Sequence, residues 1–426
     1  MPSTDAHPRW QRTVHVVAAT QVAVLVGFNF AFPFLPLLIQ ELGVTDRGEL
    51  ALWTGLAIGL SGIVMAVVSP IWGLAADRFG RKTMLIRSIG AGAILTGLQA
   101  AVTNVAQLAV IRVLQGALTG TQTAGWMLIA GIAPKERTGY SIGLLNTAIQ
   151  LGNLAGPVLG GIAVATIGLR SSFLVGAVVL GICTIITIAF VEDVPVAPQT
   201  EGRGIRGLAS DIVTPFSWPS LRGPLVVGSV VQIVGSGTVA LTAIYMQDLA
   251  RPSWLTVELT IGLALALVAL TAAIAMPILG SWADRHDPRA LLVAGLAIFG
   301  VSLVPQALIP DAVAYLALRT VTGVGIAAVT SAVAVLTRAG APRGGEGRAF
   351  GALAAAQNLG WGVGPLVGSA FAAAAGIPAL YLVGAVVAIG LVPLSLSRML
   401  FPVTEHATAV AAEPAPLAIS TATAED

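Results

Sequence analysis

Twelve apolar stretches, each of about 20 residues or more, fill most of this 426-residue chain. Apolar residues make up 56% of the chain and charged residues only 10%, which is too little charge for a surface that faces water. The sequence therefore predicts an all-α membrane protein with twelve transmembrane helices. We expect the spans at residues 14–40, 50–76, 83–102, 105–131, 140–166, 172–191, 223–249, 257–282, 290–309, 311–338, 349–375 and 377–401.

The second half of the chain repeats the first at an offset of 207 or 208 residues. The repeated pairs are Pro70/Pro277, Asp77/Asp284, Arg78/Arg285, Arg112/Arg319, Gly116/Gly323, Gly143/Gly351, Gly152/Gly360, Gly156/Gly364, Pro157/Pro365 and Gly160/Gly368. Such a repeat predicts two six-helix bundles. We expect a cytoplasmic N-terminus at 1–13, bundles at 14–191 and 223–402, a cytoplasmic linker at 192–222, and a disordered cytoplasmic tail at 403–426.

The basic residues predict the orientation in the membrane. With the N-terminus inside, seventeen Lys and Arg residues fall in cytoplasmic segments and three in outer loops. Cytoplasmic segments carry the excess of bases in membrane proteins. We therefore expect a multi-pass protein of the plasma (cytoplasmic) membrane with both termini in the cytoplasm. Arg accounts for 20 of the 22 basic residues, which together with abundant Ala and Gly suggests a bacterial gene.

The segment Gly73-Leu-Ala-Ala-Asp77-Arg78-Phe-Gly80-Arg81-Lys82 lies between the second and third spans. It resembles the loop signature of the major facilitator superfamily, which implies a latch that holds the cytoplasmic side shut. The latch residues so implied are Gly73, Asp77, Arg78, Gly80, Arg81, Lys82, Asp284 and Arg285. An Asp at a helix end can face the positive N-terminal end of a neighbouring helix, a contact worth roughly 0.3–2 kcal/mol. The alternative is that these are ordinary loop charges on the cytoplasmic side.

Two further motifs narrow the resemblance. Arg112-Val-Leu-Gln115-Gly116 resembles the superfamily's fourth-span motif. The fifth span is similar to the helix-bend motif of twelve-span drug:proton antiporters at Gly143, Gly152, Gly156, Pro157, Gly160 and Gly161. The runs Pro33–Pro36 and Trp53–Gly55 look most like the MdtG type of multidrug resistance transporter. The resemblance covers residues 14–400 and implies the major facilitator fold.

The fifth-span glycines predict close helix packing. Gly152, Gly156 and Gly160 are four residues apart and form a row that lets another helix approach. Pro157 removes a backbone donor and bends the helix. In the antiporters, this bend is thought to seal the cavity against ion leak; packing alone is the alternative. The second copy ends in Gly368-Ser369 and matches less well.

Polar residues of the fourth and fifth spans predict a cavity wall. Arg112, Gln115, Thr119, Gln122 and Trp126 fall within about 80° on a helical wheel. Such a stripe must face protein or water rather than lipid. Asn146, Gln150 and Asn153 repeat the pattern on the fifth span, and Asn29 lies deep in the first. Hydrogen bonding between helices is the alternative. The face below Arg319 reads Thr322, Ile326, Val329 and Val333, which predicts an apolar opposite wall suited to amphiphilic substrates.

The carboxylates depart from the family pattern. Many drug:proton antiporters keep an acid deep in the first span, but this region reads Gly27-Phe28-Asn29-Phe30, and no span of the sequence carries Asp, Glu or His at mid-membrane. We therefore consider a peripheral acid, Glu41, as the proton carrier, paired with the buried Arg112. The alternative leaves Glu41 in solvent and Arg112 hydrogen-bonded to carbonyls or substrate.

The sequence as a whole favours a secondary active transporter. It would export drug-like or amphiphilic small organic molecules by alternating access and proton antiport, as a monomer in the lipid bilayer. We expect no enzymatic activity, cofactor, metal or nucleic-acid partner. The alternatives are metabolite uptake or facilitated diffusion within the same superfamily, and, more remotely, a membrane-embedded enzyme or receptor.

Overall fold

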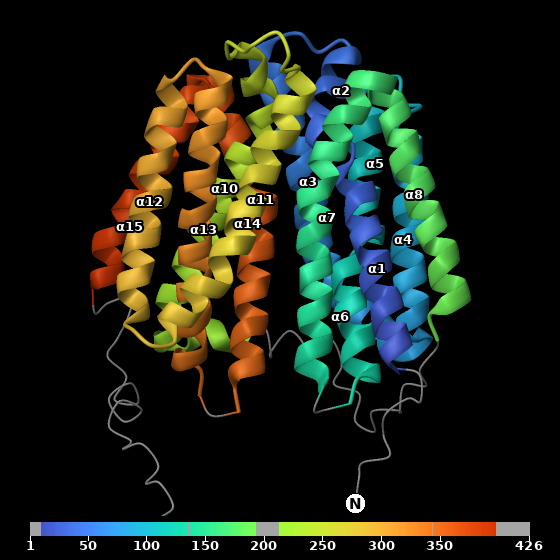
Figure 1. Ribbon diagram of the computed structural model, residues 1–426, viewed down its shortest axis with the longest axis vertical. Coiled ribbons are helices and arrows are strands. Elements are labelled where there is room, and N and C mark those ends of the chain that lie inside the picture. Colours follow the sequence, from blue (N-terminus) through green and yellow to red (C-terminus); the bar gives the residue numbers. More distant parts are fainter. Residues whose placement is uncertain (1–9, 135–136, 193–212, 343, 398–426) are drawn as a thin grey trace, which may run out of the picture.

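The computed structural model describes residues 10–134, 137–192, 213–342 and 344–397, apart from the side chain of Asp77. The expected tail at 403–426 and most of the expected linker lie outside these residues. Residues of the linker that are described form two short 3₁₀ helices, η3 (Thr214–Ser217) and η4 (Pro219–Leu221). The long elements of the described residues are α-helices, which run roughly parallel or antiparallel to one another (Figure 1).

The first half begins with a bent span. Helix α1 (Trp10–Asn29) is followed by the 3₁₀ helix η1 (Phe32–Phe34) and by α2 (Leu35–Glu41). Pro33 and Pro36 lack backbone N–H groups, so the helical ladder is interrupted here. The rest of this half comprises α3 (Arg47–Phe79), α4 (Arg81–Gln99), α5 (Val105–Leu118), α6 (Thr121–Ile132), α7 (Thr138–Ile167) and α8 (Leu169–Phe190).

The second half repeats this arrangement. Its helices are α10 (Arg222–Asp248), α11 (Val257–Ala283), α12 (Pro288–Leu308), α13 (Ala312–Gly340), α14 (Glu346–Ala375) and α15 (Ile377–Leu396). The repeat extends to the helix caps, because the side chain of Asn104 accepts a hydrogen bond from the backbone N–H of Gln107, and that of Asp311 accepts one from Ala314. The expected all-α architecture with an internal repeat is confirmed.

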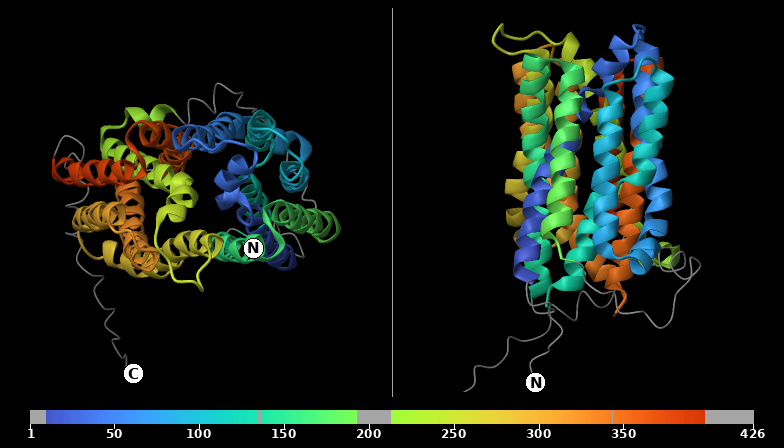
Figure 2. Two further views of the ribbon diagram at one scale, coloured as in Figure 1. Left: turned by 90° about the horizontal axis from the view of Figure 1, so that it is seen from above. Right: turned by 90° about the vertical axis from the view of Figure 1, so that its right-hand side faces the viewer.

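Nine helical units of the described residues are long and apolar enough to cross a membrane by length and composition alone. The other three expected spans correspond to α4, to the pair α5 and α6, and to α14. Helix α4 carries Arg81, Lys82 and Arg87, while α5 and α6 are each too short because the fourth span is broken. Figure 2 shows the helices of the two halves from above, as two groups that lie side by side.

Among the described residues, the two halves pack against each other near one end and in the middle of the helices, but not at the other end. We call the end with residues 78–82 and 284–289 the inner end, and the end with residues 41–47 and 248–251 the outer end. At the outer end, one continuous apolar core contains residues of both halves, such as Phe34 and Met246. Towards the inner end there are two separate cores, one around Leu85 and Leu128 in the first half, the other in the second.

Candidate functional site

Glycines on α3 show how the halves diverge. Helix α3 packs on α14, where an added Cβ at Gly55 would lie 2.6 Å from the carbonyl oxygen of Pro365. At about 100° per residue, Gly73 lies on the same face as Gly55, five turns nearer the inner end. There a Cβ would meet nothing within 4 Å. The same face of one helix is therefore packed near the outer end and free near the inner end.

Helix α7 shows the same divergence against α11. A Cβ at Gly161 would lie 2.6 Å from the carbonyl oxygen of Glu258, whereas one at Gly143, on the same face, would meet nothing within 4 Å. The structure thus has a space between its halves that is closed at the outer end and open at the inner end.

Polar contacts between the halves also lie at the outer end. Arg47 donates to both carboxylate oxygens of Asp248, at 2.6 and 2.5 Å. Gln40 and Gln247, which are related by the repeat, exchange amide hydrogen bonds of 3.1 Å. These contacts tie α2 and the start of α3 to the end of α10, and they add to the apolar core beneath them.

Some of the expected polar residues of the first half lie together on α1, α6 and α7. On α7, Asn146 and Gln150 lie within about 60° of the Gly143–Gly161 face. Trp126, 39% exposed on α6, donates from its indole N–H to Oδ1 of Asn146 at 3.0 Å. Asn29 donates to Oδ1 of Asn153 at 2.9 Å, and Asn153 donates to Gln150 at 3.5 Å. The structure therefore brings α1, α6 and α7 together in one amide-rich wall.

The fourth span is not the single helix we expected. Helix α5 ends at Leu118 and α6 begins at Thr121, because Gly120 adopts a φ of +127°, a conformation that favours glycine. The predicted five-residue stripe is wrong as one continuous face. Gln115 above the break is buried, and Thr119 donates to its carbonyl oxygen, while Gln122 and Trp126 below the break are partly or largely exposed.

The expected pair between Arg112 and Glu41 is not formed. Arg112 donates from Nε to the carbonyl oxygen of Ala57 at 3.3 Å, and from its terminal nitrogens to Ser61 and Gln115. Glu41 lies instead 3.4 Å from Nε of Arg170, with both side chains more than 40% exposed. The bend after Asn29 explains the difference, because it places the end of α2 beside the start of α8 rather than beside α5.

The wall of the second half is not where the sequence placed it. Thr322, Val329 and Val333 on α13 are at most 2% exposed and pack inside the second bundle. Asn358 on α14 is exposed and lies within about 20° of Gly351, on the face directed at the first half. The signal for Asn358 was present in the sequence, since it stands 208 residues after Gln150. The opposite wall is thus less apolar than expected.

The glycine row of α7 packs against α1 as its spacing indicates. A Cβ at Gly152 would lie 2.8 Å from the carbonyl oxygen of Val22, and one at Gly156 would lie 2.7 Å from Cβ of Asn29. Gly160 approaches Phe30 more closely still. The second copy makes equivalent contacts between α14 and α10, despite Ser369 at its end.

Two of the residues expected to form the latch, Arg81 and Lys82, bind within the first half. Arg81 donates to the carbonyl oxygen of Met127 at 2.9 Å, and Lys82 donates to that of Ile188 at 3.0 Å, near the C-terminal end of α8. Bases are stabilised at such negative helix ends. Gly80, which separates α3 from α4, has a φ of +92°. Asp284 and Arg285 are exposed, and the Asp77 side chain lies outside the described atoms.

Arg87 lies inside the expected third span, 83–102. It stands in the second turn of α4, with its guanidinium 3.4 Å from the ring centre of Trp72. The indole of Trp72 donates to the carbonyl oxygen of Ala117 at 2.6 Å. This contact satisfies a carbonyl that the break at Gly120 leaves without its helical partner.

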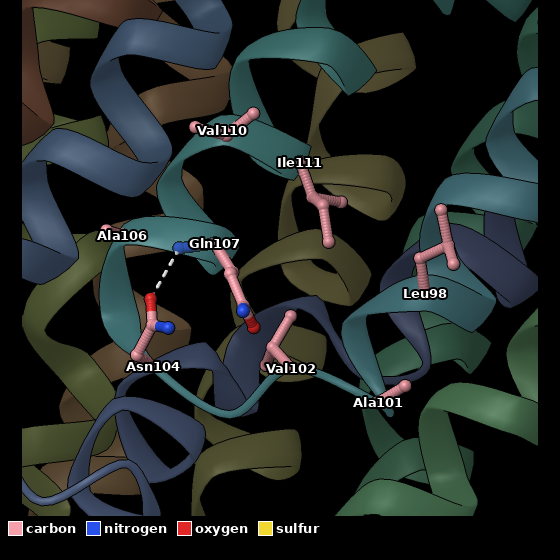
Figure 3. Close-up of a pocket in the computed structure, with 8 residues that line it drawn as sticks. All are labelled: Leu98, Ala101, Val102, Asn104, Ala106, Gln107, Val110 and Ile111. Carbon is pink, nitrogen blue, oxygen red and sulfur yellow. Dashed lines mark hydrogen bonds between the residues drawn. The ribbon is translucent and has the colours of Figure 1, made fainter.

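A separate hollow lies on the outer flank of the first half. It has a volume of about 490 Å³ and lies between the ends of α4 and α5 (Figure 3). Its lining is mostly apolar, and its Asn104 caps α5 through the hydrogen bond to Gln107 N drawn there. None of the predicted site residues borders it, so we place the candidate site between the halves.

Known proteins are similar to this chain in sequence and in fold. The profile of the Major Facilitator Superfamily matches residues 17–257 and 225–422. Multidrug resistance protein MdtG of Enterobacter lignolyticus (strain SCF1) is 31% identical over 390 residues, which cover 91% of this chain and 92% of that protein. A multi-drug resistance efflux pump PmrA homolog of Lactococcus lactis subsp. lactis (strain IL1403) is 32% identical over 364 residues, covering 85% and 89%.

Among solved structures, a bacterial homolog of the human lysosomal transporter Spinster, in an inward-facing and occupied conformation, superposes with a TM-score of 0.71. It is 16% identical and covers 93% of this chain and 96% of that one. Repeat, fold and sequence agree, and the chain belongs to the major facilitator superfamily of transporters.

Proposed function

We propose that this protein exports amphiphilic small organic molecules across the cytoplasmic membrane by alternating access, with its inner end in the cytoplasm. The observation that supports this most is the space between the halves, closed at the outer end and open at the inner end. Its amide-rich wall offers hydrogen bonds, and its aromatic residue Trp126 offers an apolar surface. The relatives named as multidrug resistance proteins support export of drug-like molecules.

Each half is a rigid bundle with its own inner core, so the two can rock about the outer contacts. One chain supplies both halves, and a monomer is sufficient for this motion. The latch at residues 73–82 then closes the inner end in the opposite state. Asp77 would bind a helix end of the second half, a role for which its place at the inner end of α3 is suitable.

Proton antiport is the energy source we propose, because one charge moving through 100 mV supplies about 2.3 kcal/mol. Within the described residues, Asp and Glu lie at helix ends or in loops, so any proton step uses a peripheral acid. The same observation favours a second candidate, facilitated diffusion or uptake of a metabolite without proton coupling.

Substrate accumulation in cells that express the protein distinguishes export by proton antiport from facilitated diffusion or uptake. Export by antiport predicts low accumulation of a fluorescent amphiphile that rises to the level of empty-vector cells when an uncoupler is added. Facilitated diffusion predicts accumulation that the uncoupler does not change. Gly156→Leu serves as a transport-inactive control. Cells that express it should accumulate the amphiphile to the level of empty-vector cells, with or without the uncoupler.

A further inference from the structure

Two buried arginines occupy equivalent places in the two halves. Nε of Arg112 donates to the carbonyl oxygen of Ala57 at 3.3 Å, and Nε of Arg319 donates to that of Ala264 at 3.0 Å. The two donors are 207 residues apart, and so are the two acceptors. Arg112 is 7% exposed and Arg319 is 2% exposed. Because an arginine stays protonated in proteins, each half holds one buried positive charge.

The first of these charges has a full set of neutral acceptors. The terminal nitrogens of Arg112 donate to Oε1 of Gln115 at 2.5 Å and to Oγ of Ser61 at 3.2 Å. Gln115 is itself held by Thr96 and Gln99. Arg112 therefore has a structural place in the first bundle.

The second charge lacks these acceptors. The residues 207 positions after Ser61 and Gln115 are Val268 and Thr322. Val268 has no acceptor, and the Thr322 hydroxyl is already bonded to Gln306 at 2.8 Å. Among the described residues, Arg319 makes one hydrogen bond, to the carbonyl oxygen of Ala264. Its terminal nitrogens retain donors for another group.

The carbonyl acceptors of both arginines lie next to the closed outer end of the space between the halves. A small hollow there, of about 10 Å³, is lined by residues of both halves that include Ile58, Leu265 and Phe32. Ile58 and Leu265 directly follow the carbonyl acceptors of the two arginines. The Arg112 guanidinium lies 5.1 Å from the ring centre of Phe32. Arg112 is thus separated from this hollow by one ring, and the repeat gives Arg319 the equivalent position in the second half.

We propose that the space accepts substrates with an acidic group on an apolar body, and that Arg319 provides the counter-charge for that group. The acidic group is a carboxylate, sulfonate or phosphonate. This inference rests on the proposed transport function and names its substrate class. A guanidinium with free donors binds such groups through two parallel hydrogen bonds. Arg319 reaches the group when the outer contacts loosen and the hollow widens.

Binding to the purified protein in uncharged detergent tests the proposal. The probes are tritiated naphthalene-2-sulfonate and its uncharged analogue naphthalene-2-sulfonamide. We expect the wild type to bind the sulfonate about tenfold more tightly or better, since hydrogen bonds to charged groups are strong. Arg319→Gln should abolish this preference, and Arg319→Lys should retain part of it. Equal binding of the two probes by the wild type overturns the proposal, as does failure to bind either.

Arg112→Gln is the matched control, because it removes the equivalent charge of the first half. Arg112→Gln should lower the melting temperature and keep the preference for the sulfonate. If Arg112→Gln loses this preference while Arg319→Gln keeps it, Arg319 is not the counter-charge. Should Arg319→Gln not fold, the double variant Val268→Ser/Thr322→Gln gives Arg319 the acceptors that Arg112 has. We expect it to reduce the sulfonate preference, and an unchanged preference counts against Arg319.

A lipid headgroup carries the same acidic chemistry. The titration is therefore repeated with phosphatidylglycerol in the micelles. Competition that disappears in Arg319→Gln shows that a lipid phosphate reaches the same guanidinium, and lack of competition leaves the soluble anion as its ligand. These results do not depend on transport, so failure here is distinct from failure of the uncoupler experiment.

Discussion

The carbonyl oxygen of Pro157 lies against Gly262 across the boundary between the two halves. The repeat produces the same contact a second time, between Pro365 and Gly55. Each proline that bends its helix thus places its carbonyl on a glycine of the other half, and neither glycine position has room for a Cβ. These two contacts bracket the closed outer end.

Gly262→Leu should open the outer end. An overpacked contact costs about 1–3 kcal/mol, enough to shift a two-state equilibrium roughly tenfold. The measurement is disulfide formation between Gln40→Cys and Gln247→Cys, whose side chains touch when the outer end is closed. We expect much less crosslinking in Gly262→Leu than in Gly181→Leu, where a Cβ meets nothing within 4 Å. Equal crosslinking in both would show that the proline–glycine contact does not control closure.

Gly156→Leu should disable transport without preventing insertion. A leucine there must displace Asn29 and the backbone of α1, on which the amide-rich wall depends. Transport of a fluorescent amphiphile, normalised to protein in the membrane, should fall roughly tenfold or more by the same overpacking cost. Gly390→Leu, on α15 with open space around it, should transport normally. Normal transport by Gly156→Leu would refute the packing role of this row.

Asp77→Asn should slow the cycle more than it weakens substrate binding. The proposed latch acts on one state, through a helix-end contact of roughly 0.3–2 kcal/mol. We expect the rate at saturating substrate to fall about two- to thirtyfold, with the half-saturating concentration nearly unchanged. Initial rates in vesicles over a range of substrate concentrations provide both values. A raised half-saturating concentration with an unchanged maximal rate is the contrary result.

Glu41→Gln should leave the pH dependence of transport unchanged. Glu41 pairs with Arg170 at the exposed outer end, and such exposed ion pairs contribute only about 0.2–1 kcal/mol. Arg112, its expected partner, is bonded to Ala57, Ser61 and Gln115 instead. Transport rates from pH 5.5 to 8.5 check this, with Arg170→Gln as the matched variant. A displaced pH profile in Glu41→Gln alone would restore Glu41 as a proton carrier.

The architecture could be predicted from the sequence because its signals are long-range and redundant. Span-length apolar runs allow little besides membrane helices, and the offset between Arg112 and Arg319 relates the halves. The amide wall on α7 followed from helical spacing alone. The break at Gly120 did not, because glycine also occurs inside regular membrane helices and its φ depends on tertiary packing.

Side-chain partners were the least predictable part of the site. Glu41 and Arg112 lie on one side of the membrane, but the bend after Asn29 decides which base Glu41 meets. Likewise, the polar N-terminal counterpart of the α13 face below Arg319 predicts a wall there. Packing in the second bundle buries that face, and α14 supplies Asn358 instead.

Alternating access is tested most directly by distances measured across both ends of the same molecule. Spin labels at Thr45→Cys and Ser253→Cys report on the outer end, and labels at Gly139→Cys and Gly347→Cys report on the inner end, each pair in a Cys183→Ala background. Double electron–electron resonance should show a short outer and a long inner distance without substrate. With a transported amphiphile, the outer distance should lengthen as the inner one shortens. Distances that stay fixed, or that lengthen and shorten together, would contradict the account.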